Sequence, residues 1–401
     1  MNKETVNERH VKNNVVRFML LYSARAIALM CASGSLMQTF LATLGFDSSL
    51  IYIHTTALQA AGIATIMLMS HWVDKGNLIK RAALSQIPLG LLFLVYVPIA
   101  VAKNSSPLTY LILLFVGVVQ QISAGLYTVC DYKIPYYIFK PEEYGKIMSI
   151  AGIISSLVTL GISAAITYLV GTFGFLNVFP YAAMLSIFCV ALSVVSTAYM
   201  KSLTESFGND SEVGLEEKPA RVSVFRKKIF WYFAPANLLR GINCGVITVL
   251  ATIAFELGYN ETVTTAMVTV QSVASLLSCT FMALTITRFS YRNTVFVGSL
   301  SMLSLPLLLI KNSAIFLIVY AVIIFGRTFV DYGVPAMLLR IVPVEMAGPY
   351  NAWRMALHNV GILIGTISAT VIPTAALLII AALTQLVSGV MYWLAKTRSK
   401  A

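Results

Sequence analysis

The feature that most constrains the fold of this chain is a succession of apolar segments about as long as a bilayer is thick. A helix needs roughly 20 apolar residues to cross the hydrocarbon core, and segments of this length recur between short polar breaks along the 401 residues. We identify twelve of them: 16–44, 49–71, 79–102, 107–131, 146–170, 175–200, 229–257, 263–287, 293–310, 313–339, 350–372 and 375–395. No alternating strand pattern appears, and only helices or closed barrels span lipid. The sequence therefore predicts an all-α membrane protein with twelve transmembrane helices.

Composition excludes a soluble helical protein. Only 11% of the residues are charged and 58% are apolar, whereas a soluble domain has about 25% charged residues. The five cysteines all fall within predicted helices and none has CxxC spacing, so we expect neither disulfides nor a zinc site. We expect no metal and no cofactor.

The basic residues lie almost entirely on one side of the predicted membrane. Short loops rich in Lys and Arg stay in the cytoplasm, and only Lys103 and Lys311 fall in the opposite loops if the N-terminus is cytoplasmic. We therefore expect both termini in the cytoplasm and a multi-pass location in the plasma (inner) membrane. This distribution accounts for the net charge of +12, and no basic run interleaved with aromatic residues predicts nucleic-acid binding.

One connection divides the chain. Residues 201–228 are long, polar and charged, which is typical of a cytoplasmic linker. They separate an N-terminal six-helix bundle, 1–200, from a C-terminal one, 229–401. The segments 127–135 and 327–335 share Thr, Asp, Tyr and Pro at an offset of 200 residues, and 44–47 resembles 257–260. These pairs indicate an internal duplication, which is common in transporters.

At this point the sequence resembles the major facilitator superfamily. The loop 70–76, with Asp74, Lys75 and Gly76, is similar to the Gly-x-x-x-Asp-Arg/Lys-x-Gly loop of that family, although Ser70 replaces the first glycine. Segment 127–146, with Asp131 before Pro135 and Tyr136, faintly resembles sugar and cation symporters related to melibiose permease. The resemblance implies two six-helix bundles and a central cavity lined by helices 1, 4, 7 and 10.

Ionisable residues inside predicted spans are the functional candidates, because a charge in lipid is costly. Five follow that inner ring: Arg25, Asp131, Arg240, Arg327 and Asp331. Three cations against two carboxylates favour an anionic or zwitterionic solute, because guanidinium groups match carboxylate and phosphate oxygens. The substrate site is predicted to contain the arginines together with neutral polar neighbours, namely Gln120, Gln121, Asn237, Tyr127 and Tyr332.

Separate roles are predicted for the carboxylates. Asp331 lies one helical turn from Arg327, so an anion that neutralises Arg327 favours proton uptake by Asp331, and we assign proton coupling to Asp331. Asp131 and Asp74 are predicted to be gate residues. The alternative is that Arg327 and Asp331, spaced i, i+4, form only a structural pair.

The favoured function is secondary active transport of a small anionic or zwitterionic solute by alternating access, with the proton as coupling ion. The chain has no phosphate-binding loop for ATP and no nucleophile and base pair, so we do not expect an enzyme. A drug or metabolite efflux antiporter, a sugar/cation symporter and a lipid flippase stay open. The expected partners are the solute, the proton and the lipid bilayer, and we expect a monomer.

Overall fold

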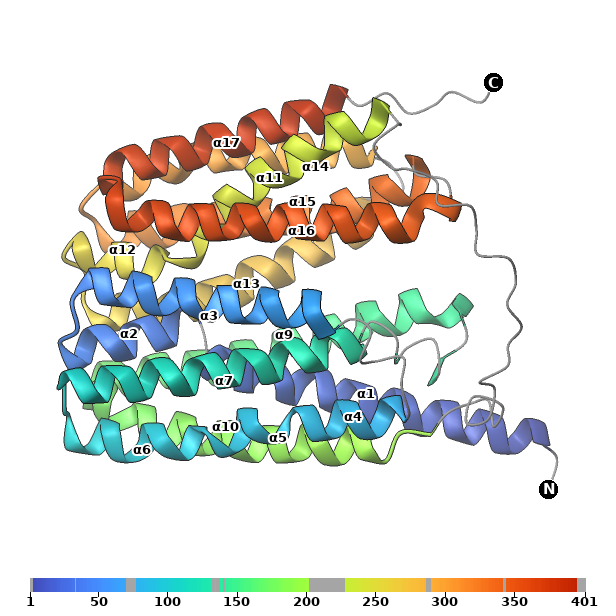
Figure 1. Cartoon of the computed structure of the whole chain (residues 1–401), viewed down its shortest axis with the longest axis horizontal. Coiled ribbons are helices and arrows are strands. Elements are labelled where there is room, and N and C mark those ends of the chain that lie inside the picture. The colour runs from blue at the N-terminus through green and yellow to red at the C-terminus, as the bar shows by residue number, and fades with distance from the viewer. Residues whose placement is uncertain are drawn as a thin grey trace. The chain divides into compact units, whose positions relative to one another are not determined.

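A computed structural model describes the chain except for residues 1–2, 33, 70–76, 132–133, 135–137, 140, 202–227, 286–289, 342–343 and 395–401. Every regular element of the described residues is a helix, as Figure 1 shows. The predicted gate residue Asp74 and most of the predicted linker lie outside the described residues. The helices form two compact units, which we call unit 1 and unit 2.

Unit 1 contains the helices before the linker. They are α1 (Lys3–Ala32), α2 (Ser35–Leu44), α3 (Ser48–Met69), α4 (Leu78–Ser85), α5 (Ile87–Leu91), α6 (Phe93–Ala102), α7 (Pro107–Asp131), α9 (Pro141–Phe173) and α10 (Phe175–Ala198). Short interruptions divide two of the predicted spans. One lies between α1 and α2, and the others separate α4, α5 and α6 next to Pro88, which lacks a backbone N–H for the helix ladder.

Unit 2 contains the helices after the linker. They are α11 (Lys228–Thr248), α12 (Leu250–Glu256), α13 (Glu261–Thr285), α14 (Tyr291–Leu300), the 3-10 helix η4 (Ser301–Leu309), α15 (Ser313–Ile341), α16 (Val344–Val371) and α17 (Thr374–Leu394). The predicted span 293–310 is thus part α-helix and part 3-10 helix, with Pro306 in the 3-10 part.

The number of clear spans differs from the twelve predicted. Ten helices or joined helices of the described residues are long and apolar enough to cross a membrane, and α11 with α12, bent by 49°, makes an eleventh if the pair is one broken span. The helix α16, which covers the predicted span 350–372 except for its last residue, is not among the helices that are apolar enough to cross a membrane. Its first half carries Asn351, Arg354 and His358, and these polar residues lower its hydropathy.

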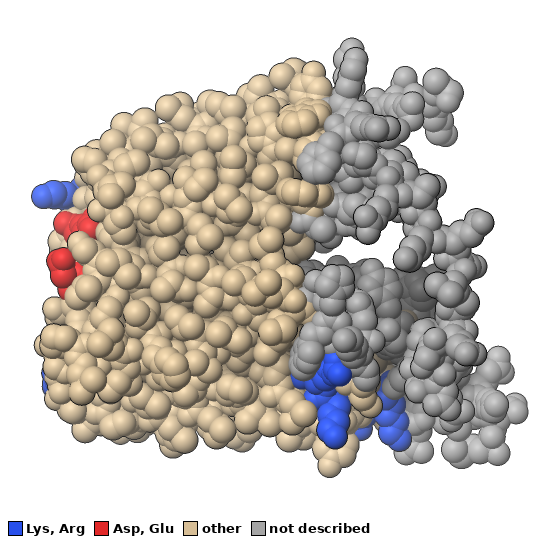
Figure 2. All heavy atoms as spheres, viewed as in Figure 1, with Lys and Arg blue, Asp and Glu red and all other residues tan. Residues whose placement is uncertain are grey.

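The surface of the described residues agrees with a membrane protein. On the face drawn in Figure 2, the described Lys, Arg, Asp and Glu side chains gather at the two ends of the molecule's helices, and the long middle zone carries other residue types. Large apolar side chains are exposed on the described helices, among them Leu68, Phe115 and Tyr181. Apolar side chains in such numbers are stable against lipid rather than water.

The two units repeat one local structure. Gly45 and Gly258 both have left-handed backbone, with φ of 94° and 88°. In each unit the glycine N–H bonds a carbonyl three residues back and the next residue bonds one five residues back, as in Phe46 to Leu41 and Tyr259 to Ala254. This is the Schellman cap, which favours glycine because it has no Cβ. The same turn therefore ends the first span of each unit.

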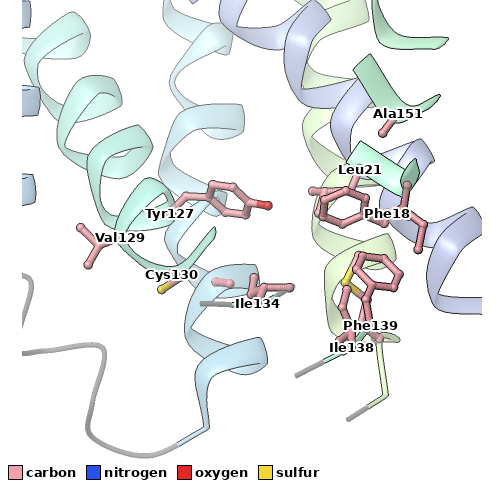
Figure 3. Packing of buried hydrophobic residues seen from close by; sticks show 12 residues of the cluster. Phe18, Leu21, Tyr127, Val129, Cys130, Ile134, Ile138, Phe139 and Ala151 are labelled. Atoms are coloured by element: carbon pink, nitrogen blue, oxygen red, sulfur yellow. The ribbon is translucent and has the colours of Figure 1, made fainter. Parts of the chain in front are cut away.

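Apolar cores hold each unit together. In unit 1 a buried cluster joins α1, α7 and α9 through Phe18, Tyr127, Cys130 and Ala151, and Figure 3 shows the Tyr127 ring extending from its helix into this cluster. In unit 2 a second cluster includes Phe233 of α11, Val330 of α15 and Tyr392 of α17. These clusters fix the helices that carry the ionisable residues.

Glycines bring α11 and α16 unusually close in unit 2. A Cβ at Gly361 would lie 2.2 Å from the carbonyl oxygen of Leu238, and one at Gly241 would lie 2.1 Å from that of His358. Gly245 and Gly365 make the same kind of contact one turn further on. Small residues at this spacing let helix backbones approach. The contact places His358 of α16 beside the segment of α11 that carries Arg240.

Candidate functional site

Three ionisable side chains meet inside unit 2. Arg240 comes from α11, and Arg327 and Asp331 lie one turn apart on α15. Arg240 Nη2 donates to Asp331 Oδ1, and Arg327 Nε donates to Asp331 Oδ2 at 3.4 Å. One carboxylate therefore pairs with two guanidinium groups. We call Arg240, Arg327 and Asp331 the unit 2 triad.

The triad has hydrogen-bond donors to spare. Arg240 is almost fully buried, with 6% of its side chain exposed. Tyr392 interacts with its guanidinium group, and its Nε and Nη1 atoms have no hydrogen-bond partner among the described residues. Nδ1 of His358 is also buried without a partner, and His358 interacts electrostatically with Arg240 and Asp331. Unpaired buried polar atoms cost free energy, so this group of nitrogens is suited to a ligand that accepts hydrogen bonds.

The accessibility of the triad is uneven. The side chains of Arg327 and Asp331 are 33% and 37% exposed, whereas Arg240 lies behind them. With Asp331 ionised, two cations face one anion and the triad carries a formal charge of +1. A carboxylate or phosphate can reach Arg327 and compensate this charge, because both groups match the fork of a guanidinium.

A second group of ionisable residues lies inside unit 1. The Arg25 guanidinium of α1 lies 3.5 Å from the centre of the Tyr127 ring, and its Nη2 donates to the Ala124 carbonyl at 3.2 Å and to Thr128 Oγ1 at 3.3 Å. The Tyr127 hydroxyl donates to Asp131 Oδ1 at 3.0 Å. We call Arg25, Tyr127 and Asp131 the unit 1 relay.

Two of the predicted neutral ligands are engaged in internal hydrogen bonds. Gln120 is fully buried, accepts from Tyr96 Oη at 2.5 Å and donates to the Leu89 carbonyl at 3.1 Å. Asn237 is buried in unit 2, accepts from Tyr392 Oη at 2.8 Å and donates to the Phe233 carbonyl at 2.7 Å. Both amides therefore join helices within their own units.

Tyr127 belongs to the unit 1 relay, and the remaining two predicted neutral ligands, Gln121 and Tyr332, are more accessible. Gln121 is half-buried, and its Oε1 lies 3.6 Å from where a Cβ on Gly62 would be. Tyr332 is 58% exposed and hydrogen-bonds Cys279 through its hydroxyl. Tyr332 interacts electrostatically with Asp331, and so does His358. His358 is not among the site residues predicted from the sequence, and the approach of α16 to α11 places it beside the segment that carries Arg240.

Known proteins match this chain by structure and not by sequence. No protein-family model matches the sequence, and no curated protein matches it. A bacterial homologue of the iron transporter ferroportin in its inward-facing state has a TM-score of 0.67 at 13% identity, over 96% of this chain and 98% of that chain. A D-xylose-proton symporter has a TM-score of 0.67 at 12% identity, over 96% of each chain.

A third solved structure, a variant of the nucleoside transporter NupG, has a TM-score of 0.66 at 12% identity, over 94% of this chain and 98% of that chain. These likenesses confirm the predicted resemblance to major facilitator transporters at the level of the fold. With its many apolar helices, the chain is a multi-pass integral membrane protein that has the fold of these transporters.

Proposed function

We propose that this protein is a secondary active transporter that moves a small anionic or zwitterionic solute by alternating access of its two units, coupled to the proton. The observation that carries the proposal is the unit 2 triad, in which one carboxylate is shared by two arginines. Two nitrogens of the buried Arg240 have no hydrogen-bond partner in the part of the chain that the structure describes. On this proposal Arg327 and Arg240 bind the anionic part of the solute, and His358 adds a neutral polar contact.

The triad favours an anion over a metal ion as the bound species. The described residues contain no group of three or more His, Cys, Asp or Glu side chains that could hold a metal ion. Asp331, the acid of the triad, is already paired with two cations. A purely structural ion pair needs only one arginine for the one acid, whereas the triad keeps a formal charge of +1 that a solute can compensate.

The experiment is a thermal-shift assay of the purified protein in detergent, with lactate, succinate, glutamate and glycerol 3-phosphate as probes and choline as the cationic control. A ligand that binds only the folded state raises its stability, by about 2.7 kcal/mol at 100 times its Kd. We expect at least one anionic probe to raise the Tm and choline to leave it unchanged.

The matched variants are Arg240→Gln, Arg327→Gln and Lys311→Gln. Lys311 is an exposed cation of unit 2 in the turn after η4, so its replacement changes the net charge equally without touching the triad. We expect the ligand-dependent rise in Tm to disappear in the two arginine variants and to persist in Lys311→Gln. An unchanged rise in both arginine variants contradicts the proposal.

The orientation in the membrane is part of the same proposal. Because nearly all loop Lys and Arg residues fall on one side of the predicted spans, we propose that both termini and the linker face the cytoplasm. The test uses Ser105→Cys and Ser211→Cys in a background without the five native cysteines. An impermeant thiol reagent added to whole cells should label Cys at 105 and not at 211, and the reverse pattern overturns the topology.

A further inference from the structure

The unit 1 relay contains a carboxylate, Asp131, that forms no ion pair with any residue that the structure describes. Among the described residues, no cation lies within 4 Å of Asp131, and its one hydrogen-bond donor is the Tyr127 hydroxyl at 3.0 Å. A second oxygen, Oδ2, has no donor among these residues. Asp331 of unit 2, at the matching repeat position, is contacted by Arg240 on one oxygen and by Arg327 on the other. The two aspartates thus occupy opposite electrostatic environments.

Arg25 is close to Asp131, but its contacts go elsewhere. Its guanidinium stacks on the face of Tyr127 and donates to Ala124 and Thr128, while its Nη1 is buried without a partner. A cation over an aromatic face is attracted by the ring quadrupole. The phenol of Tyr127 therefore lies between the cation and the carboxylate, with its ring toward Arg25 and its hydroxyl toward Asp131.

The other titratable groups around this carboxylate are few. The described groups that interact within the relay are Arg25 and Tyr22 from α1, and Tyr127 and Cys130 from α7. Of these only Arg25 is a cation. An ionised carboxylate in a membrane helix is costly without a paired cation, whereas the protonated acid is neutral and can keep its hydrogen bond with Tyr127. Two arginines instead stabilise the ionised form of Asp331.

We propose that Asp131, rather than Asp331, is the carboxyl group that takes up the coupling proton, and that Tyr127 transmits the change to Arg25. This inference rests on the proposed function. A hydronium ion gives its proton to Oδ2 of Asp131, which accepts no hydrogen bond from the described residues, and is left as a water molecule. The relay then changes from a formal charge of zero to +1. Arg25, with its unpartnered Nη1, becomes the uncompensated cation of unit 1, so proton uptake favours binding of an anionic solute.

The experiment detects the protonated acid directly and needs no solute. Infrared spectra of the protein in proteoliposomes are recorded as the pH is changed, and a protonated carboxylic acid gives a C=O stretching band that a carboxylate lacks. The variants are Asp131→Asn, Asp331→Asn and Asp47→Asn, the last at an exposed aspartate of the turn after α2. We expect the band of a buried acid to be lost in Asp131→Asn alone.

Loss of that band in Asp331→Asn with its retention in Asp131→Asn overturns the inference, and so does the absence of any pH-dependent band from a buried acid. Circular dichroism of each variant confirms that it is folded. Because the infrared signal needs no ligand, its failure leaves the anion-dependent thermal shifts of the triad intact. Conversely, if no anion raises the Tm, the infrared band of Asp131 is still expected.

Tyr127→Phe tests the link between the two ends of the relay. Phenylalanine keeps the ring under Arg25 and removes the hydroxyl that donates to the ionised carboxylate. A hydrogen bond to a charged group is worth enough to shift the midpoint of protonation by about one pH unit. We expect the midpoint of the Asp131 band to move upward by about that amount in Tyr127→Phe. An unchanged midpoint contradicts the role of Tyr127.

Discussion

Units 1 and 2 differ in the residue that lies one helical turn before a matching aspartate, and the surroundings of the two aspartates differ as a result. Position 327 is arginine and contributes a guanidinium to Asp331, whereas position 127 is tyrosine and contributes a hydroxyl to Asp131. The arginine from the first span of each unit also behaves differently. Arg240 bonds Asp331 directly, and Arg25 stacks on the tyrosine.

This difference suggests how a duplicated fold can divide a coupled reaction. In unit 2 the aspartate is held between cations, and the surplus charge is available to an anion. In unit 1 the aspartate has no ion pair among the described residues, and on our proposal it takes up a proton. On these proposals the exchange of tyrosine for arginine one turn before the aspartate separates the two roles, because residues at i and i+4 are neighbours on a helix.

The units also differ in how closely their helices pack at glycine residues. Gly361 and Gly365 of α16 contact the backbone of α11. In α9, the fifth predicted span of unit 1, a Cβ added at Gly152 or Gly161 would meet no atom within 4 Å. Unit 2 therefore depends on close backbone contact next to its ionisable residues, and unit 1 does not at these glycines. Four pairs of substitutions test these contrasts.

The largest effect is expected for Gly361→Val. Its Cβ would lie 2.2 Å from the Leu238 carbonyl, and backbone cannot move aside as a flexible side chain does, so we expect a loss of more than about 3 kcal/mol of unfolding free energy. Gly161→Val, the control in unit 1, should change stability by less than about 1 kcal/mol. Chemical denaturation in mixed micelles measures both. Similar losses in the two variants contradict the contrast in packing.

Next in size is the effect of Asp331→Asn. It leaves the buried Arg240 without its acid, and breaking such a pair costs up to about 3–5 kcal/mol. We expect about 2 kcal/mol because the Asp331 side chain is 37% exposed and solvent screens the charge. Asp131→Asn should cost less than about 1 kcal/mol, since asparagine still accepts from Tyr127. The same denaturation assay measures both variants. A greater loss of stability in Asp131→Asn than in Asp331→Asn contradicts the contrast between the two aspartates.

A smaller loss is expected when the internal amides are removed. Gln120→Leu and Asn237→Leu leave the hydroxyls of Tyr96 and Tyr392 without their acceptors, at a cost of about 1–2 kcal/mol each. Anion-dependent thermal shifts should be unchanged in both. Gln121→Leu, at the neighbouring half-buried amide, serves as the control and should scarcely affect stability. A lost thermal shift in Gln120→Leu or Asn237→Leu would instead make that amide a ligand.

The smallest effects should be equal in the two units. Gly45→Ala and Gly258→Ala each place a Cβ on left-handed backbone, which costs about 1 kcal/mol. No atom lies within 4 Å of the added methyl group at either glycine. The loss of stability therefore comes only from the strain of left-handed backbone. Gly152→Ala in α9 is the control, and helix propensity there favours alanine. Unequal losses at positions 45 and 258 contradict the repeated cap.

Much of the fold could be predicted from the sequence, because the bilayer fixes the length of an apolar helix. Ten of the described helices or joined helices coincide with predicted spans and pass as membrane helices on length and composition. The exceptions have local causes. Polar residues such as Arg354 and His358 lower the hydropathy of α16, and the bend of 49° between α11 and α12 interrupts the span predicted at 229–257.

The sequence by itself determined which positions of which helices carry the ionisable groups, and that Tyr127 with Asp131 and Arg327 with Asp331 are neighbours. Both follow from the helical period of 3.6 residues, which needs no knowledge of the rest of the fold. Only the tertiary structure decided the partners across helices. These partners depend on the distance between two helix axes and on the level along the axes at which the helices meet. They are the bond from Arg240 to Asp331, the stacking of Arg25 on Tyr127 and the position of His358 near the triad. Glycines such as Gly241 and Gly361 set that distance through contacts between residues far apart in the chain.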